Sequence, residues 1–397
     1  MKKYYALAGY WGFDQEAPMG ITSYEYIPES GELKLIETIR EDIVSGTILV
    51  DPERKVAYVT DEIGHIKGDL GGGGYVRAFR IDPATGRLTM IAEQRSLSNE
   101  PSGLCLDVDK KRLLCCHCSD PFHVTKIRKG ENGKFTSDTV YDDTAVVMFP
   151  VADDGNLEPV CDVAITEGAG ATGPNSQTYI HPLSGHIMHI QIISRHHSVE
   201  RNADGSLFVV SDRGMDKFHT FKVDREQNRL IHVNEVDTGV GTIPRSGVFH
   251  PTLPYIYTNY SKMPYVESYR YDSETGAMEL VCREEVKHEG AVPDGGSFIT
   301  MIVHPNGKFL YNAGTPDIIS VFDVKEDGKI ALKQTISCEG INPRVLTLSP
   351  DNRYLFSGNN RSRDIVQFEV HEDGTLSPTG RRFESVSPSA LTIFTLE

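Results

Sequence analysis

One pattern of apolar and polar positions recurs seven times along the chain. An aromatic, a polar and an apolar residue lead into a turn rich in Asp, Glu and Gly, and another apolar residue follows the turn. This alternation predicts two antiparallel β-strands joined by a short turn. The copies cover residues 24–33, 79–88, 149–157, 221–230, 269–278, 322–330 and 368–376.

A second predicted hairpin lies upstream of most of these copies. It covers residues 49–59, 106–115, 201–210, 249–258, 303–312 and 348–357. Each repeat therefore contains four strands, which we name A to D in chain order, with almost no helical periodicity. Such repeats predict an all-β protein, a seven-bladed β-propeller of four-stranded antiparallel blades, with a β-sandwich as the alternative.

The first repeat lacks an A strand of its own. Residues 386–394 (VSPSALTIF) match the A strand at 341–349 (INPRVLTLS), so the C-terminal strand is predicted to complete the N-terminal blade. This pairing closes the ring and removes the open sheet edges. Residues 1–397 are thus expected to form a single propeller domain.

The predicted topology also indicates where a site lies. In a four-stranded antiparallel blade, the B-to-C and D-to-A connections share one face of the ring. The long insertions 10–19, 61–74, 117–143 and 168–195 all fall in these connections, and long loops in a compact domain are typically functional. The candidate residues that begin A strands or end B strands on this face are Asp61, Glu62, His117, His197, Asp212, Arg213, Arg245, Tyr260, Ser261, Arg344, Asn359 and Arg361.

Composition narrows the choice of partners. A net charge of −16 opposes binding to nucleic acid or anionic lipid, which need basic surfaces. No apolar run approaches the roughly 20 residues of a membrane helix, and the N-terminus lacks the features of a signal peptide. Seven scattered cysteines argue against a disulfide framework and fit a reducing compartment. We therefore expect a cytoplasmic protein, of undetermined oligomeric state, that binds a small anionic molecule in a local basic pocket.

Several motifs resemble those of one known family. They are GPN (173–175), HHSV (196–199), SDRGMDK (211–217), IPRSGVFHP (243–251), YIYTNYS (255–261) and NPR (342–344). The whole chain resembles the seven-bladed β-propeller lactonase family, which includes a type of 6-phosphogluconolactonase and enzymes that cyclise 3-carboxy-cis,cis-muconate. The resemblance implies a cofactor-independent enzyme that opens a lactone of a sugar acid or related carboxylate, or closes one in reverse.

The resemblance places the family's channel histidine on His197 and the arginine of its Pro-Arg motif on Arg245. A neutral imidazole suits a base that takes a proton from water, and a guanidinium suits the charge that develops on a carbonyl. We therefore predict these two as catalytic residues. Substrate contacts are predicted for Asp61, Glu62, His117, His196, Tyr260, Ser261 and Arg344.

Two departures from the family leave the substrate open. Ser261 stands where the cyclising members carry a glutamate, and Gly314 stands where they carry an arginine. Asp61 and Glu62 are candidate replacements for the lost glutamate.

Alternative interpretations remain at this point. His197 could hydrogen-bond a neighbouring blade, Arg245 could form an inter-blade ion pair, and the mouth of the ring could bind a ligand without chemistry. A metal-dependent lactonase would need ligands from the histidine-rich segment 181–197 (His181, His186, His189, His196 and His197). Because that segment has no matching carboxylate or cysteine spacing, we predict no metal and no other cofactor.

Overall fold

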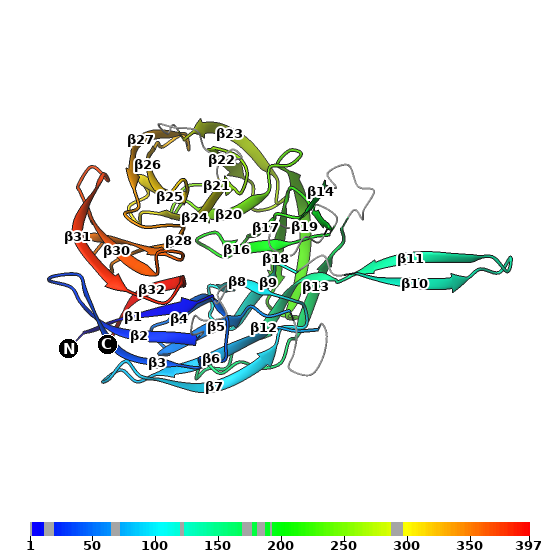
Figure 1. Ribbon diagram of the computed structural model, residues 1–397, viewed down its shortest axis with the longest axis horizontal. Coiled ribbons are helices and arrows are strands. Elements are labelled where there is room, and N and C mark those ends of the chain that lie inside the picture. The colour runs from blue at the N-terminus through cyan, green and yellow to red at the C-terminus, as the bar shows by residue number, and fades with distance from the viewer. Residues whose placement is uncertain are drawn as a thin grey trace.

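The computed structural model describes residues 2–11, 20–64, 72–119, 123–168, 177–180, 187–190, 193–286 and 297–397. These residues form seven four-stranded antiparallel blades around a central axis (Figure 1). The predicted seven-bladed β-propeller is therefore confirmed. No helix that could span a membrane occurs among these residues.

The strands follow, from the axis outward in each blade. Blade 1 contains β32 (Pro388–Leu396), β1 (Lys3–Tyr10), β2 (Gly20–Ile27) and β3 (Glu32–Ile39). Blade 2 contains β4 (Ser45–Asp51), β5 (Val56–Asp61), β6 (Tyr75–Ile81) and β7 (Leu88–Arg95). Blade 3 contains β8 (Pro101–Leu106), β9 (Arg112–His117), β12 (Thr144–Pro150) and β13 (Asp162–Thr166). Blade 4 contains β16 (His196–Arg201), β17 (Phe208–Asp212), β18 (Lys217–Asp224) and β19 (Arg229–Asp237).

The remaining blades have the same order. Blade 5 contains β20 (Pro244–Phe249), β21 (Tyr255–Tyr260), β22 (Tyr265–Tyr271) and β23 (Met278–Glu285). Blade 6 contains β24 (Ser297–Val303), β25 (Phe309–Thr315), β26 (Ile318–Val324) and β27 (Ile330–Ser337). Blade 7 contains β28 (Pro343–Leu348), β29 (Tyr354–Asn359), β30 (Asp364–Val370) and β31 (Leu376–Glu384).

The apolar core is divided among the contacts between blades. Seven clusters of buried apolar side chains join neighbouring blades, and each cluster draws on two of them. Middle strands such as β5 are buried at every position, whereas outer strands such as β7 are mostly exposed or half-buried. Each blade has a neighbouring blade on both sides, so its middle strands bury both of their faces. This explains why the middle strands are rich in apolar residues on both faces.

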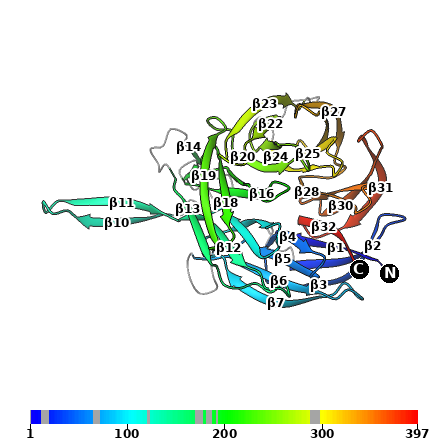
Figure 2. The ribbon, with the colours of Figure 1, turned by 180° about the vertical axis from the view of Figure 1, so that it is seen from behind.

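The ring closes by pairing the two ends of the chain. β32 pairs antiparallel with β1, from Lys3 opposite Leu396 to Tyr10 opposite Pro388. The chain termini consequently lie side by side in both views (Figures 1 and 2). The predicted closure by the C-terminal strand is confirmed.

The long connections are partly structured. All four predicted insertions join B to C or D to A strands, so they share one face of the ring as expected. The insertion in blade 3 contains a hairpin, β10 (His123–Lys129) and β11 (Phe135–Tyr141), which extends away from the ring (Figure 2). A second hairpin, β14 (Gln177–Ile180) and β15 (Ile187–Ile190), lies in the connection to blade 4. The insertion in blade 3 therefore projects outward from the ring.

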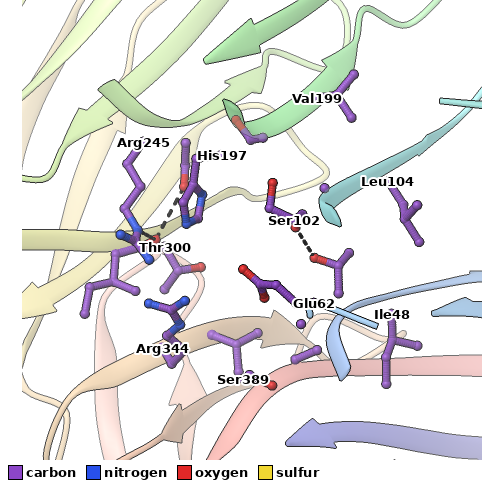
Figure 3. A pocket seen from close by; sticks show the side chains of 18 of the residues that line it. Ile48, Glu62, Ser102, Leu104, His197, Val199, Arg245, Thr300, Arg344 and Ser389 are labelled. Atoms are coloured by element: carbon purple, nitrogen blue, oxygen red, sulfur yellow. Dashed lines mark hydrogen bonds between the residues drawn. The ribbon is translucent and has the colours of Figure 1, made fainter. Parts of the chain in front are cut away.

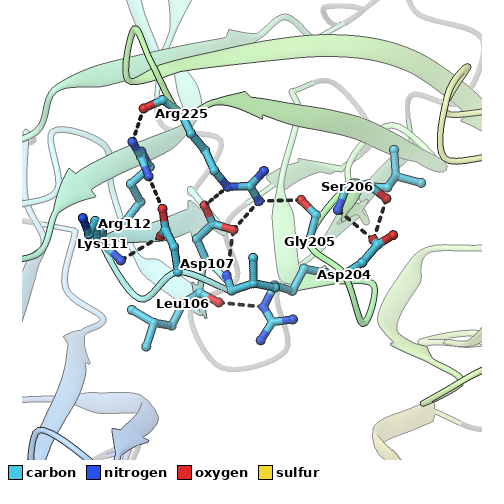
Figure 4. A network of polar contacts seen from close by, with 12 residues as sticks. Leu106, Asp107, Lys111, Arg112, Asp204, Gly205, Ser206 and Arg225 are labelled. Atoms are coloured by element: carbon cyan, nitrogen blue, oxygen red, sulfur yellow. Dashed lines mark hydrogen bonds and ion pairs between the residues drawn. The ribbon is translucent and has the colours of Figure 1, made fainter.

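Polar contacts on the opposite face hold blades 3 and 4 together (Figure 4). The Arg225 guanidinium, after β18, donates to both carboxylate oxygens of Asp107, after β8, at 2.6 and 2.8 Å. It also donates to the Gly205 carbonyl at 2.7 Å, while Arg112 donates to the Arg225 carbonyl. Asp107 is 1% exposed, so its charge depends on these partners.

Replacing Arg225 by Ala should destabilise the protein by about 1–3 kcal/mol, because a buried carboxylate loses a partly exposed bidentate partner. The free energy of unfolding from urea titration measures this loss. The exposed Arg229, on the same hairpin, makes none of these contacts, so Arg229→Ala serves as the control. Equal stability of the two variants would show that the Asp107 contact contributes nothing.

Candidate active site

A cavity of about 220 Å³ lies on the axis of the ring. The inner strands of all seven blades contribute to its wall, from Gly46 in blade 2 to Leu391 in blade 1. His197, Arg245, Arg344 and Glu62 carry the ionisable groups that Figure 3 labels around this space. The structure therefore brings both predicted catalytic residues, and two of the predicted substrate contacts, to one cavity.

A β-bulge near the start of each inner strand positions these side chains. In blade 4, His196 pairs with Asp212 and Ser198 pairs with Ser211, so His197 has no partner across the ladder. A bulged residue leaves the ladder and its side chain is turned in a new direction. His197 consequently lines the axial cavity although its neighbour His196 does not.

The same irregularity occurs in every blade. The bulged residues are Ser389, Gly46 with Thr47, Ser102, His197, Arg245, Ile299 and Arg344, in blades 1 to 7, and all of them line the cavity. In blades 1, 3, 5 and 7 a proline directly precedes the bulged residue. Proline has no N–H to donate to the ladder, which suits a position where pairing is interrupted. The repeated Pro-x pair could have located Ser102 and Ser389, which we did not predict.

Bulged residues also form hydrogen bonds to neighbouring blades. The Arg245 Nε donates to the Ile299 carbonyl at 3.1 Å, and Thr47 donates to the Ser102 carbonyl at 2.6 Å. Ser389 donates to the Ser45 carbonyl at 2.7 Å. These bonds satisfy carbonyls that the bulges leave out of the ladders. Arg245 thus makes an inter-blade contact, to a backbone carbonyl, while its guanidinium lines the cavity.

Positive charge surrounds His197. Burial lowers the pKa of this imidazole well below its ordinary value, and the nearby guanidinium groups of Arg245, Arg213, Arg344 and Arg195 lower it further. Burial and the charge of Arg344 likewise lower the pKa of Arg245. The cavity therefore offers a neutral imidazole in a field that favours an anion.

Glu62 supplies a carboxylate to this basic cavity. It follows β5, and a Cβ atom at Gly46 would lie 2.0 Å from its Oε2 atom. The Glu62 carboxylate therefore occupies the space that a side chain at position 46 would take. Its negative charge raises the pKa of Arg344, against the larger effect of burial. Glu62 is thus the member of the predicted Asp61/Glu62 pair that reaches the cavity.

Four predicted contacts at the ends of B strands do not line this cavity. Asp61 accepts from the Val44 amide at 2.8 Å, and burial raises its pKa. His117 hydrogen-bonds a backbone carbonyl at 2.7 Å, and burial lowers its pKa to about 4. Tyr260 donates to a buried carboxylate, and Ser261 donates its amide to a backbone carbonyl. Asp61, His117 and Tyr260 end B strands, which are second from the axis, so the A strands stand between them and the cavity. Ser261 follows a B strand at the position equivalent to Glu62, and its shorter side chain does not line the cavity.

His196 is also absent from the cavity wall. Its Nε2 atom lies 2.8 Å from Thr166 Oγ1 and 3.1 Å from Ser194 Oγ, and burial lowers its pKa to about 3. Thr166 ends β13 of blade 3, and the His219 ring of blade 4 lies 5.6 Å from that of His196, so this side chain packs between the two blades. Of the histidine-rich segment, His181 and His186 lie outside the described residues, as does the side chain of His189.

Trp11 was not anticipated. The Arg344 guanidinium carbon lies 4.4 Å from the centre of its indole ring, which is the geometry of a cation–π contact. This is the single tryptophan of the chain. Its place in the first B-to-C connection brings part of a long loop to the cavity mouth.

The sequence profile of the family "Lactonase, 7-bladed beta-propeller" matches residues 9–393. The chain belongs to this lactonase family. Among relatives, a 6-phosphogluconolactonase of Formosa agariphila is 24% identical over 390 residues, which cover 96% of this chain and 97% of the relative. A 6-phosphogluconolactonase of Bacillus subtilis is 27% identical over 307 residues, which cover 75% of this chain and 74% of the relative. The periplasmic gluconolactonase of Pseudomonas aeruginosa shares the fold, with a TM-score of 0.79, 22% identity and coverage of 98% and 99% of the two chains.

Anion binding at Arg344 should change the fluorescence of Trp11, because an anion that pairs with the guanidinium alters its contact with the indole. We expect a saturable change when inorganic phosphate is added. Arg344→Gln should weaken phosphate binding about 10-fold or more, as one charge-assisted hydrogen bond is lost. Arg353→Gln, at an arginine that stacks on Tyr354 outside the cavity, is the control. Identical phosphate titrations of both variants would contradict an anion site at Arg344.

A pH effect on stability should come from Glu200, on β16. It lines both the axial cavity and a second cavity of about 480 Å³ near the A-to-B turns. Burial raises its pKa from 4.5 to about 7. The folded state therefore holds its proton more tightly than the unfolded state, and the stability that this proton confers is lost as pH rises from 4.5 through about 7.

Glu200→Gln should reduce the change in unfolding free energy across this pH range by on the order of 1–3 kcal/mol. Unfolding free energies measured at intervals across that pH range give the comparison. Glu369→Gln, at an exposed position of β30, should leave the wild-type slope intact. A Glu200→Gln protein that retains the full slope would refute the role of this carboxyl group.

Proposed function

We propose that this protein hydrolyses the lactone of a sugar acid that carries an anionic group, as 6-phosphogluconolactone does. The observation that carries the proposal is the convergence of His197, Arg245 and Arg344 on one cavity through equivalent bulges. Family membership and the names of the relatives support the reaction class. The volume of the cavity, below the roughly 300–1,000 Å³ of sites for drug-sized ligands, favours a small substrate.

The arginines bind and polarise the substrate. A chain with a net charge of −16 would repel an anion, so binding depends on the local charge of Arg245 and Arg344. One guanidinium pairs with the phosphate or carboxylate of the substrate, and the other donates to the lactone carbonyl oxygen. This second contact strengthens as negative charge develops on that oxygen.

His197 then acts on water. Its neutral imidazole accepts a proton from a water molecule whose oxygen attacks the lactone carbonyl carbon. When the tetrahedral intermediate collapses, the bond between that carbon and the ring oxygen breaks. The imidazolium returns its proton to the leaving oxygen, so the products are a free hydroxyl group and a carboxylic acid, and His197 is regenerated. The carboxylic acid then releases its proton to solvent at neutral pH.

Substrate binding makes His197 a stronger proton acceptor. In the free protein the surrounding guanidinium groups hold the pKa of His197 down, which makes it a weak proton acceptor. A bound anion offsets those charges and raises the pKa towards neutrality. Glu62, beside Arg344, contributes negative charge to the same cavity. The imidazole therefore becomes an effective base when an anionic substrate is present.

His197→Ala should lower kcat for lactone hydrolysis by about 10²–10⁴-fold, the usual contribution of a general base. The melting temperature should stay unchanged. A pH-indicator assay on phosphorylated and unphosphorylated aldonolactones measures turnover. For the wild type, the acid limb of kcat/KM, which reports the free protein, should lie at lower pH than the acid limb of kcat.

His371→Ala, at an exposed histidine of the last blade, is the matched control and should keep full activity. Wild-type activity in His197→Ala would refute the assignment of the base. A wild-type protein that binds these lactones without turning any over would instead indicate a binding module.

A further inference from the structure

A second cluster of ligating side chains lies on the outer strands of blade 4. His219 belongs to β18, and His232 and Glu235 belong to β19. His219 Nδ1 lies 3.4 Å from His232 Nε2 and 3.7 Å from Glu235 Oε1. One potential ligand atom from each residue lies within 4.8 Å of the other two. None of the three lines the axial cavity.

A β-bulge brings the three side chains to one face of the blade. His219 pairs with Glu235 and Phe221 pairs with His232, so that Val233 has no partner. Residues three apart on a regular strand point to opposite faces. The extra residue reverses this alternation and turns His232 towards His219. Without the bulge, His232 and Glu235 could not act together.

Asp212 fixes the orientation of the central histidine. Its carboxylate accepts from His219 Nε2 at 3.0 Å. The same carboxylate accepts from the amides of Arg195 and Gly214 at 2.8 and 2.9 Å. Despite burial, these contacts lower the pKa of Asp212. His219 Nε2 thus faces a carboxylate, and Nδ1 faces the other two residues. A carboxylate behind a ligating histidine is the usual support of a metal site.

The other blades show what these positions do when they are only structural. In blade 2 the residues equivalent to His219 and Glu235 are Arg77 and Glu93, which form an ion pair at 2.8 Å. The residue equivalent to His232 there is Met90. In blade 5 the corresponding pair is Glu267 with Arg283 at 2.6 Å, and the third position is Leu280. Blade 4 thus replaces an arginine by an imidazole and an apolar residue by a second imidazole.

We infer that His219 Nδ1, His232 Nε2 and Glu235 Oε1 form a binding site for a divalent transition-metal ion, with zinc preferred. Bonds of about 2.0–2.1 Å at a tetrahedral ion place two nitrogen ligands about 3.3 Å apart, close to the 3.4 Å between the two imidazoles. Two nitrogens and one carboxylate oxygen form a donor set that suits zinc and leave the fourth position to solvent.

Accessibility and charge are compatible with this assignment. His219 is buried, whereas His232 and Glu235 are exposed, so an ion can enter from solvent. Lys217 binds the other oxygen of Glu235, Oε2, at 2.7 Å, which leaves Oε1 directed at the imidazoles.

Zinc titration of the untagged, chelator-treated full-length protein against a chromophoric competitor tests this site. His232→Leu reproduces the apolar residue of blade 5 and should preserve the fold. The loss of a supporting residue alone costs about 10–100-fold in metal affinity. Removal of a ligand should therefore lower the zinc affinity of this site by at least about 100-fold, so that the variant binds one equivalent of zinc fewer than the wild type. Cobalt bound to the wild type should show the visible absorption of a tetrahedral ion, which the variant should lack.

His371→Leu, at an exposed histidine of blade 7, is the control and should bind zinc as the wild type does. Glu235→Gln provides a second variant, with an expected loss of about 10-fold or more. Melting temperatures of the metal-free proteins confirm that each variant folds. Equal zinc stoichiometry and affinity in the wild type and in both site variants would overturn the inference. Lactone turnover is measured separately, so a failure here is distinct from a failure of the proposed function.

Discussion

Burial of both faces of every blade is the constraint on which this structure depends. The apolar clusters lie between blades and each draws on two of them, so a blade without both neighbours would expose half of its core. Only a closed ring gives every blade two neighbours. The pairing of β32 with β1 is therefore the contact that completes the core, and it also fixes the size of the space at the axis.

Within that ring, the bulges of the fold determine where the site residues lie, and the sequence determines which chemical groups they carry. The fold supplies an equivalent bulged position near the start of each inner strand, and all of these positions line the axial cavity. The sequence places a histidine and two arginines at three of them, and serine, glycine with threonine, or isoleucine at the others. A second bulge, between outer strands, acts in the same way in blade 4, where it turns His232 towards His219.

The charge of the cavity is opposite in sign to that of the chain as a whole. The chain is strongly acidic overall, yet its inner strands concentrate guanidinium groups where burial lowers their pKa. A backbone carbonyl contacts Arg245 and an indole ring contacts Arg344, while Glu62 offsets part of the positive charge at Arg344. Burial and this positive field together lower the pKa of His197.

The sequence by itself determined the repeat, the number of blades and the closure by the C-terminal strand, because strand alternation and turn residues are local signals. It also placed His197, Arg245, Arg344 and Glu62 on one face. Only the tertiary structure decided which residues of that face reach the axis. The A strands cover Asp61, His117 and Tyr260, and a bulge turns His197 away from His196. Ser261 does not line the cavity, although the longer Glu62 at the equivalent position does. The contact of Trp11 with Arg344, and the cluster of His219, His232 and Glu235, likewise depend on register and on the approach of distant segments, which a local pattern does not encode.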